Sequence, residues 1–317
     1  MRNRLAPLAL LLLAGAALVA GCTGPAATPD PYELLATSTR AAWNPVQVNI
    51  GFKITAGGST ITLDPKDIAV VVDTAATTFA FHMSLPAAGL GIPSSALDQL
   101  GISGDSIDFD VLYAGDALYL KSALMKPMLR LFLGPTNKVP AGDLTGWLKL
   151  GTRADLIALA ALSGGASGMP SFAPSSAGAR DFKASFDEIG VTLTTGAVEK
   201  RNGSDARHVT IAMDIQKLLT NPEFLQGAGP QSGPMIAAMK DVTFSGDLWI
   251  DPATNRVLEM DGHGASTNSA VGAIDMTITA HDPDGSVPLA APSTSVDVPI
   301  GTLITEIMKL IGRGAES

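Results

Sequence analysis

The chain of 317 residues contains one cysteine, Cys22, and only 5% aromatic residues. A single cysteine excludes both an intramolecular disulfide and a metal site built from several cysteines. Charged residues make up 16% of the chain, against about 25% in an average soluble domain. With 30 acidic and 21 basic residues the net charge is −9, and no run of lysine or arginine could follow a phosphate backbone. We therefore expect no nucleic-acid partner.

The familiar catalytic signatures are missing as well. The sequence has no G-x-S-x-G, S-x-x-K or H-E-x-x-H motif and no P-loop. The four histidines are His82, His208, His263 and His281. None lies three or four residues from another, so they do not indicate a metal site. We predict no catalytic residue, no metal and no cofactor, with one alternative left open: a hydrolase whose distant residues, such as His263, assemble into a triad.

The N-terminal segment has the pattern of an export signal. Arg2 and Arg4 precede sixteen almost purely apolar residues, Leu5 to Ala20, which is fewer than the roughly 20 that a membrane-spanning helix needs. Val19-Ala20-Gly21 before Cys22 resembles the bacterial lipobox, at which a peptidase cuts before an acylated cysteine. The alternative is a plain signal peptide, cut near the end of the apolar run.

The lipobox divides the chain into three parts. We predict a signal peptide over residues 1–21, a lipidated tether over residues 22–30 with lipid attachment at Cys22, and a single domain over residues 31–317. Acyl chains such as palmitate contribute about 0.8 kcal/mol per buried methylene, and two or three of them anchor a protein stably. The protein is therefore expected to be exported and held by lipid at the cell membrane or envelope, facing away from the cytoplasm.

Alternation of apolar and other residues with a period of two dominates the exported part, which predicts half-buried strands. Clear alternation occurs over residues 46–54, 79–85, 107–113, 209–213, 242–250 and 274–278. Weaker alternation occurs over residues 59–63, 68–73, 117–121, 191–200 and 257–262. The connections Ala114-Gly115-Asp116 and Asp251 to Asn255 are as short as hairpin loops, so we expect an antiparallel sheet.

Helical signals are fewer. Asp30-Pro31-Tyr32-Glu33 combines a capping aspartate, an early proline and a glutamate, which predicts a helix over residues 31–42. Thr152 and Asp155 form a second capping pair that opens a helix over residues 153–162. Further helices are expected over residues 123–133, 181–188, 214–220 and 300–311. Residues 163–178, rich in Gly, Ser and Pro, are expected to form a loop rather than a linker. The fold class predicted from these patterns is α+β.

A sheet of eight to eleven strands with one apolar face must curl, and its interior can stay partly unfilled. The alternative is that amphipathic helices fill this interior. The side chains expected to line a cavity are Val48, Ile50, Phe52, Phe79, Phe81, Met83, Ile107, Phe109, Val111, Leu118, Leu120, Leu156 and Leu159. Lys121 and Arg207 could hold a lipid head group, although a solvated strand edge is the commoner setting for such residues. The apolar connection Leu85 to Ile102 would suit an entrance flap or a membrane-touching loop.

Several segments resemble one bacterial family. Val111 to Lys121, with its embedded Tyr119-Leu120-Lys121, resembles the paired strands of the LppX/LprG-type lipoproteins of mycobacteria and related bacteria, and Trp147 to Leu150 resembles the strand that follows. Phe244 to Met260 is similar to that family's tryptophan-bearing hairpin. The resemblance implies a curved antiparallel half-barrel sheet with helices packed on its concave face around a hydrophobic cavity, as in the wider LolA-like lipoprotein-carrier superfamily.

These patterns and the resemblance lead to one functional hypothesis. The chain is expected to be a membrane-anchored lipoprotein that binds the acyl chains of lipids or glycolipids and carries or presents them in the cell envelope. Its expected partners are the lipid, the membrane that holds its anchor, and an envelope transporter. The alternative is a non-catalytic structural or adaptor lipoprotein with a filled core that binds another envelope protein.

Overall fold

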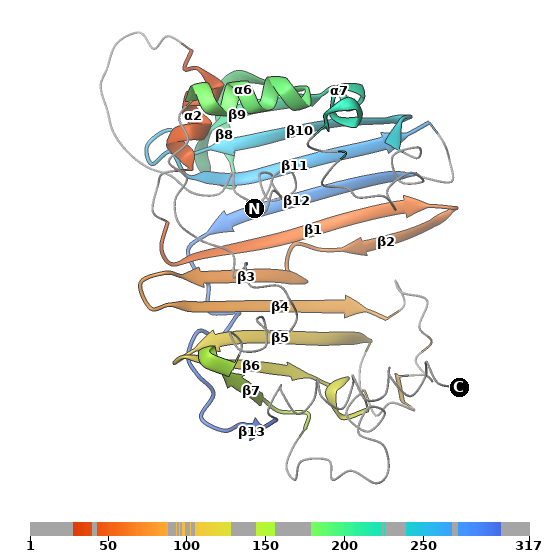
Figure 1. Cartoon of the computed structure of the whole chain (residues 1–317), viewed down its shortest axis with the longest axis vertical. Coiled ribbons are helices and arrows are strands. Elements are labelled where there is room, and N and C mark those ends of the chain that lie inside the picture. The colour runs from red at the N-terminus through yellow and green to blue at the C-terminus, as the bar shows by residue number, and fades with distance from the viewer. Residues whose placement is uncertain are drawn as a thin grey trace. The chain divides into compact units, whose positions relative to one another are not determined.

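The computed structural model describes residues 28–39, 43–87, 93, 95, 97, 98, 102, 105–127, 144–155, 179–222, 225, 239–267 and 272–298. This part of the chain is mostly β: thirteen strands, nearly all paired antiparallel, with few and short helices (Figure 1). The chain divides into two compact units, each assembled from separate stretches of sequence. Within the described residues, no helix is long and apolar enough to cross a bilayer.

The first unit contains the strand order β1-β12-β11-β10-β9-β8, with β2 paired to β1. Its strands are β1 (Val46–Ala56), β2 (Ser59–Leu63), β8 (Val191–Arg201), β9 (Ser204–Met213), β10 (Val242–Ile250), β11 (Val257–Ser266) and β12 (Ala273–His281). Each of the pairs β8–β9, β9–β10, β10–β11 and β11–β12 is antiparallel. Short connections join β8 to β9, β10 to β11 and β11 to β12 as hairpins, whereas a longer connection that contains a helix lies between β9 and β10.

Three helices belong to the first unit: α2 (Pro31–Ser38), α6 (Ala179–Ile189) and α7 (Ile215–Thr220). Asp30 begins α2 as expected, because its carboxylate accepts the Tyr32 backbone N–H at 2.8 Å. Helices α2 and α6 pack on one face of the sheet, where Tyr32, Leu35 and Phe186 join a core with inward-facing residues of β8 to β11. We call this the helix side of the first unit. Strand residues of opposite parity point to the other face.

The second unit contains the strand order β13-β7-β6-β5-β4-β3. Its strands are β3 (Ile68–Asp73), β4 (Thr78–Pro86), β5 (Ser106–Ala114), β6 (Ala117–Ser122), β7 (Leu148–Thr152) and β13 (Val296–Asp297). All its pairs are antiparallel except β13–β7, which is parallel. The C-terminal stretch that leads to β13 places Val287 and Leu289 against the sheet.

All eleven segments with a period of two form strands, so that prediction is confirmed; β13 was not predicted. The α+β class needs correction, because the described chain is mostly β. Helix α2 ends at Ser38 rather than residue 42, and of the described residues 123–127 only 125–127 are helical. In the segment 153–162 the described residues, 153–155, are helical as predicted. Residues 300–311 lie outside the described part. The half-barrel shape and the single domain stay predictions.

Two positions in the first unit depend on the left-handed backbone conformation that glycine adopts readily. Gly57 and Gly272 have φ angles of +57° and +79°, which other residues adopt only with strain. A Cβ on Gly57 would meet nothing within 4 Å, whereas one on Gly272 would lie 1.6 Å from the carbonyl oxygen of Thr55. Only at Gly272 does the backbone also lie close to another strand, at Thr55 of β1.

This difference predicts unequal effects of two matched substitutions. Gly57→Ala should lower the free energy of unfolding by about 1 kcal/mol, the cost of the left-handed conformation. Gly272→Ala adds a clash with backbone and should cost more than about 4 kcal/mol or prevent folding. Urea denaturation followed by circular dichroism measures both. Equal losses would contradict the close approach of Gly272 to β1.

Candidate functional site

The strand register of the second unit gathers large apolar side chains on one face of its sheet. Directly paired residues of antiparallel strands project to the same face. The pairings give three rows across the strands: Ile68, Met83 and Phe109; Val70, Phe81, Val111 and Leu120; and Val72, Phe79, Tyr113 and Leu118. We call this surface the apolar face. The polar side-chain atoms in these rows are the Tyr113 hydroxyl, which donates to Asp116 at 2.9 Å, and the hydroxyl of Ser122, which pairs with Phe109 at the end of the first row.

The apolar face is incompletely buried. Towards β7 it is covered, since Leu120 and Leu148 pack with Met125 and Leu144 in a closed cluster. Towards β3 and β4 the large side chains keep part of their surface accessible. Partly exposed members are Val70, Val72, Phe79, Phe81, Met83, Phe109, Val111, Tyr113 and Leu118. Side chains of this size and number are normally buried, and a contiguous accessible set is typical of a binding surface.

The opposite face of the same sheet is the better buried one, although most of its buried side chains, Tyr119 apart, are smaller. Val71, Ala80 and Leu112 are at most 1% exposed, and they form a core with alanines of β3, β5 and β6. Val287 and Leu289 of the C-terminal stretch cover this core. The chain thus covers its smaller side chains with its own residues and leaves the larger ones partly accessible.

Most of the side chains predicted to line a cavity belong to the apolar face. Phe79, Phe81, Met83, Phe109, Val111 and Leu118 lie there partly exposed, and Leu120 lies there buried. Ile107 pairs with Leu85 beside these rows and is buried in a separate cluster. Val48, Ile50 and Phe52 share one face of β1 in the first unit and are partly exposed. Cys22, Leu156 and Leu159 lie outside the described residues. That these side chains line a cavity stays a prediction.

Sequence reasoning missed Ile68, Val70, Val72 and Tyr113. Residues 68–72 are apolar at every position, so alternation could not tell which side chains share a face. The pairing of Val70 with Phe81 and of Val72 with Phe79 decides it. Tyr113 was counted as a strand residue only; burial and its bond to Asp116 raise the pKa of its hydroxyl.

Lys121 cannot serve the apolar face as a head-group ligand. It alternates with Leu120 and therefore points to the opposite face, where its ammonium lies 3.7 Å from Asp110. Asp110 also bonds His82 Nδ1 at 2.7 Å. The neighbouring Ser84 donates to Asp108, not to His82, so these residues do not form a nucleophile–base pair.

The other histidines are likewise held by side chains of adjacent strands. His208 contacts Asp247 at 2.5 Å, His263 contacts Asp275 at 2.5 Å, and His281 contacts Asn49 at 3.0 Å. Each pair ties neighbouring strands together across the sheet surface. Within the described residues, no three His, Cys, Asp or Glu side chains gather in a way that could hold a metal.

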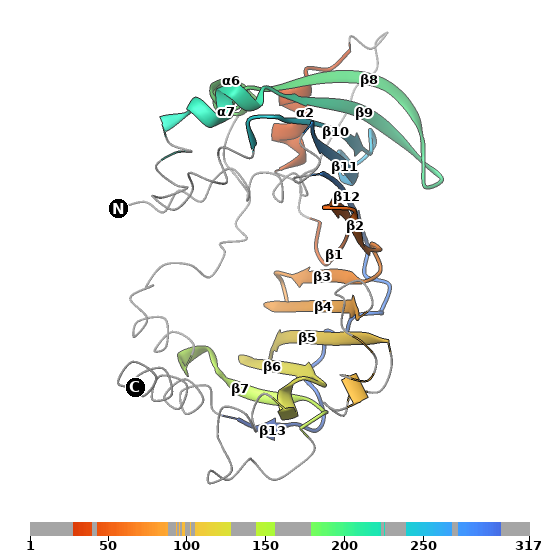
Figure 2. The ribbon, with the colours of Figure 1, turned by 90° about the vertical axis from the view of Figure 1, so that its right-hand side faces the viewer.

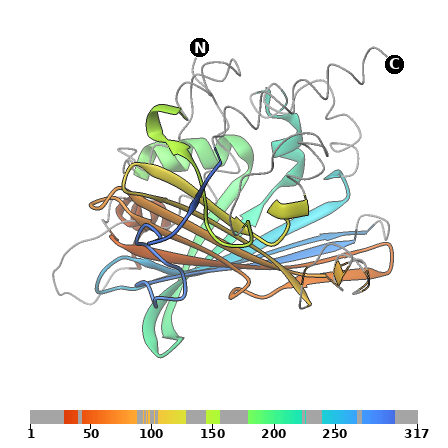
Figure 3. The same ribbon diagram turned by 90° about the horizontal axis from the view of Figure 1, so that it is seen from below.

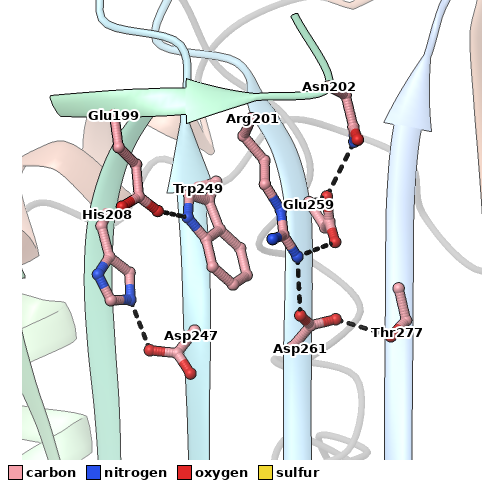
Figure 4. Close-up of polar contacts among 9 residues, drawn as sticks. All are labelled: Glu199, Arg201, Asn202, His208, Asp247, Trp249, Glu259, Asp261 and Thr277. Carbon is pink, nitrogen blue, oxygen red and sulfur yellow. Dashed lines mark hydrogen bonds and ion pairs between the residues drawn. The ribbon is translucent and has the colours of Figure 1, made fainter. Parts of the chain in front are cut away.

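The densest polar cluster lies in the first unit, around Trp249 of β10 (Figure 4). The Trp249 indole stacks on His208 at 5.2 Å between ring centroids and lies under the Arg201 guanidinium at 4.0 Å. Its Nε1 donates to Glu199 at 2.6 Å. Trp249 and Glu259 are directly paired across β10 and β11, and both are nearly inaccessible, at 6% and 5%.

Arg201 holds the second half of this cluster. Its Nε and Nη2 donate to the two oxygens of Glu259 at 2.9 and 2.5 Å, and Nη2 also reaches Asp261 at 3.1 Å. The hydrogen bond to Glu259 raises the pKa of Arg201 above its ordinary value. Asn202 donates to Glu259 and Thr277 donates to Asp261. Because these charged groups are bonded to one another, the cluster stabilises structure and offers no unoccupied charge to a ligand.

Comparisons with known proteins give likenesses of structure only. No family model matches the chain, and no curated protein matches it in sequence. The structure is similar to LprF from Mycobacterium bovis, with a TM-score of 0.35 and 11% identity over 84% of this chain and 100% of that one. It is also similar to Mycobacterium tuberculosis lipoprotein LppX, with a TM-score of 0.29 and 12% identity over 81% and 94% of the two chains. A Vibrio parahaemolyticus domain named for outer membrane lipoprotein sorting gives a TM-score of 0.20 and 9% identity over 88% and 97%.

The unequal burial of the two faces predicts unequal effects of truncation. Leu112→Ala, in the buried core, should lower the free energy of unfolding by about 2–5 kcal/mol. Phe81→Ala, on the neighbouring strand but on the apolar face, should cost only about 1–2 kcal/mol although phenylalanine is larger, because less surface leaves water there. Urea denaturation measures both. A loss at Phe81 as large as that at Leu112 would indicate that the apolar face is a filled core.

Proposed function

We propose that this chain is a membrane-anchored lipoprotein that binds the acyl chains of lipids or glycolipids on the apolar face and carries or presents them in the cell envelope. The observation that carries the proposal is the set of large, partly exposed apolar side chains arranged in rows over β3 to β6. A surface of this kind is complementary to hydrocarbon, and it places no charged side chain among its rows.

The energy of binding follows from the same rows. An acyl chain gains about 0.8 kcal/mol for each methylene that leaves water, so ten buried methylenes contribute about 8 kcal/mol before the losses of motion on binding. No covalent chemistry is needed for such binding. The absence of catalytic motifs from the sequence agrees with a carrier. The same proposal includes an envelope transporter that loads or unloads the lipid.

The location of the protein is proposed from its N-terminal sequence. The apolar run and the lipobox before Cys22 support export and acylation of that cysteine. An anchor of two or three acyl chains would hold the protein beside a supply of lipid. The net charge of −9 would favour a body that stands off from an anionic membrane surface.

Two neighbouring substitutions on β4 test the lipid-binding face. Met83→Lys places a charge among the apolar rows, while Ser84→Lys places the same charge on the opposite face, beside Asp108. We expect the wild type and Ser84→Lys to purify with bound lipid. Met83→Lys should retain at least about tenfold less, since an ammonium group in an apolar site loses hydration without a partner.

Native mass spectrometry after mild detergent extraction measures bound lipid, and circular dichroism verifies the fold of each variant. A wild-type protein that carries no lipid and takes none up from vesicles would favour the adaptor alternative. Equal lipid content in Met83→Lys and Ser84→Lys would place binding elsewhere on the chain.

The anchor has its own test. Cys22→Ala removes the only residue that can receive the lipid. The wild type should sediment with membranes, and its N-terminal peptide should show the mass of an acylated cysteine. The variant should lack that mass and leave the membrane fraction. A wild-type peptide with an unmodified Cys22, or with residues 1–21 still attached, would contradict the lipobox assignment.

A further inference from the structure

The hairpin of β8 and β9 has two parts separated by a bulge. In the part that begins at Val191 and ends at Thr195, each residue of β8 pairs in regular register with β9. The register then shifts, so that Val198 rather than Ala197 pairs with Arg207. An extra residue of this kind bends a strand and increases its twist. Figure 2 shows that the hairpin of β8 and β9 is strongly bent.

The two parts are held by different forces. Val191, Leu193, Val209 and Ile211 of the regular part lie in the apolar core under α2 and α6. No residue of the tip, which we define as residues 198–207, belongs to that core. Figure 3 shows α6 on one side of the strands of this unit and the hairpin tip on the other. Apart from the pairing of Arg207 with Ile250 of β10, the tip therefore depends on the contacts that it makes with the opposite face.

Those contacts are the polar cluster around Trp249. From the tip, Glu199 accepts the indole N–H, Arg201 covers the ring and binds Glu259 and Asp261, and Asn202 binds Glu259. Arg201 of β8 thereby crosses β10 and contacts β11, a strand with which β8 does not pair. A segment held by a few charge-assisted bonds, without a core of its own, has a lower local stability than the sheet beneath it.

The N-terminal segment meets the hairpin at the bulge. Thr195, the last regularly paired residue, donates its hydroxyl to the carbonyl oxygen of Pro29 at 2.8 Å. Asp30, the next residue, begins α2. Thr195 therefore lies at the start of the bulge and also holds the segment that leads into α2.

We propose that the tip, residues 198–207, is a latched strap: it turns at the bulge after Thr195 and is closed over Trp249 by Arg201. Glu259 and Asp261 are the carboxylates that bind Arg201 in the closed state. Opening removes the guanidinium from the indole and exposes Trp249 and Glu259 without disturbing the core under α2 and α6. The strap is a conformational device of the first unit, independent of whether the apolar face of the second unit binds lipid.

Opening of the tip can be measured by chemical labelling of a cysteine placed at a buried position. Ala206, in the tip, is fully buried at 0% exposure, and Ala80, in the core of the second unit, is 1% exposed. The variants Ala206→Cys and Ala80→Cys are made in full-length protein extracted from membranes, and the labelling of Cys22 in the parent protein is subtracted. With fast reclosing, the labelling rate is proportional to the open population.

Removing the latch should raise labelling at position 206 only. Arg201→Gln should increase the rate at least about tenfold, since it leaves Glu259 buried without its charged partner. Lys200→Gln is the matched control: its ammonium pairs with Asp205 at 2.9 Å, but both side chains are largely exposed. That change should alter the rate by less than about twofold. Arg201→Lys keeps the charge without the bidentate geometry and should give an intermediate rate.

Two results would overturn the strap. If Arg201→Gln and Lys200→Gln label equally at position 206, Arg201 does not hold the tip closed. If the rates at positions 206 and 80 rise in the same proportion, the substitution destabilises the whole chain and the tip has no separate opening. Arg201→Lys answers the same question should Arg201→Gln fail to accumulate as folded protein.

Discussion

The cross-strand register of β3 to β6 is the constraint on which the candidate site depends. Because side chains alternate between faces with a period of two, a slip of one residue would exchange the two faces of a strand. The pairing of Phe81 with both Val70 and Val111 places the large apolar side chains in common rows. The same pairing places Ala80 beside Val71 and Leu112, where small side chains let Val287 and Leu289 pack closely. Both faces thus follow from one register.

Burial then makes the two faces different. An ordinary half-buried sheet covers its apolar side and exposes its polar side. Here the covered side combines alanines, Val71 and Leu112 with the polar group of His82, Asp110 and Lys121, while the larger apolar side chains stay partly accessible. One side of the sheet therefore holds the buried core that stabilises the unit, and the other side holds the accessible apolar side chains. The accessible apolar side chains on one side therefore do not weaken the core on the other.

The first unit uses alternation in another way. Its helix side is a closed core, and its other face carries the paired residues His208, Trp249 and Glu259 across three strands. The bulge divides the β8–β9 hairpin into two parts with different roles. The regular part contributes side chains to the core, and the tip supplies Arg201, which pairs with the buried carboxylate of Glu259. Without Arg201, the buried Glu259 carboxylate would keep the Asn202 amide as a donor but lose its charged partner, so the hairpin and the sheet beneath it require each other.

The sequence by itself determined the strands, their short hairpin turns and the helix that Asp30 begins, because each depends on residues close together in the chain. Alternation also selected most of the apolar face, including Phe79, Phe81 and Val111. It failed at Val70 and Val72, where a uniformly apolar run carries no information about faces. For Lys121 the alternation with Leu120 already indicated the opposite face. Only the tertiary structure decided which strands pair, which face the C-terminal stretch covers, and that Arg201 meets Glu259, 58 residues away. Register and burial depend on contacts between distant segments, and a local period of two is compatible with many such pairings.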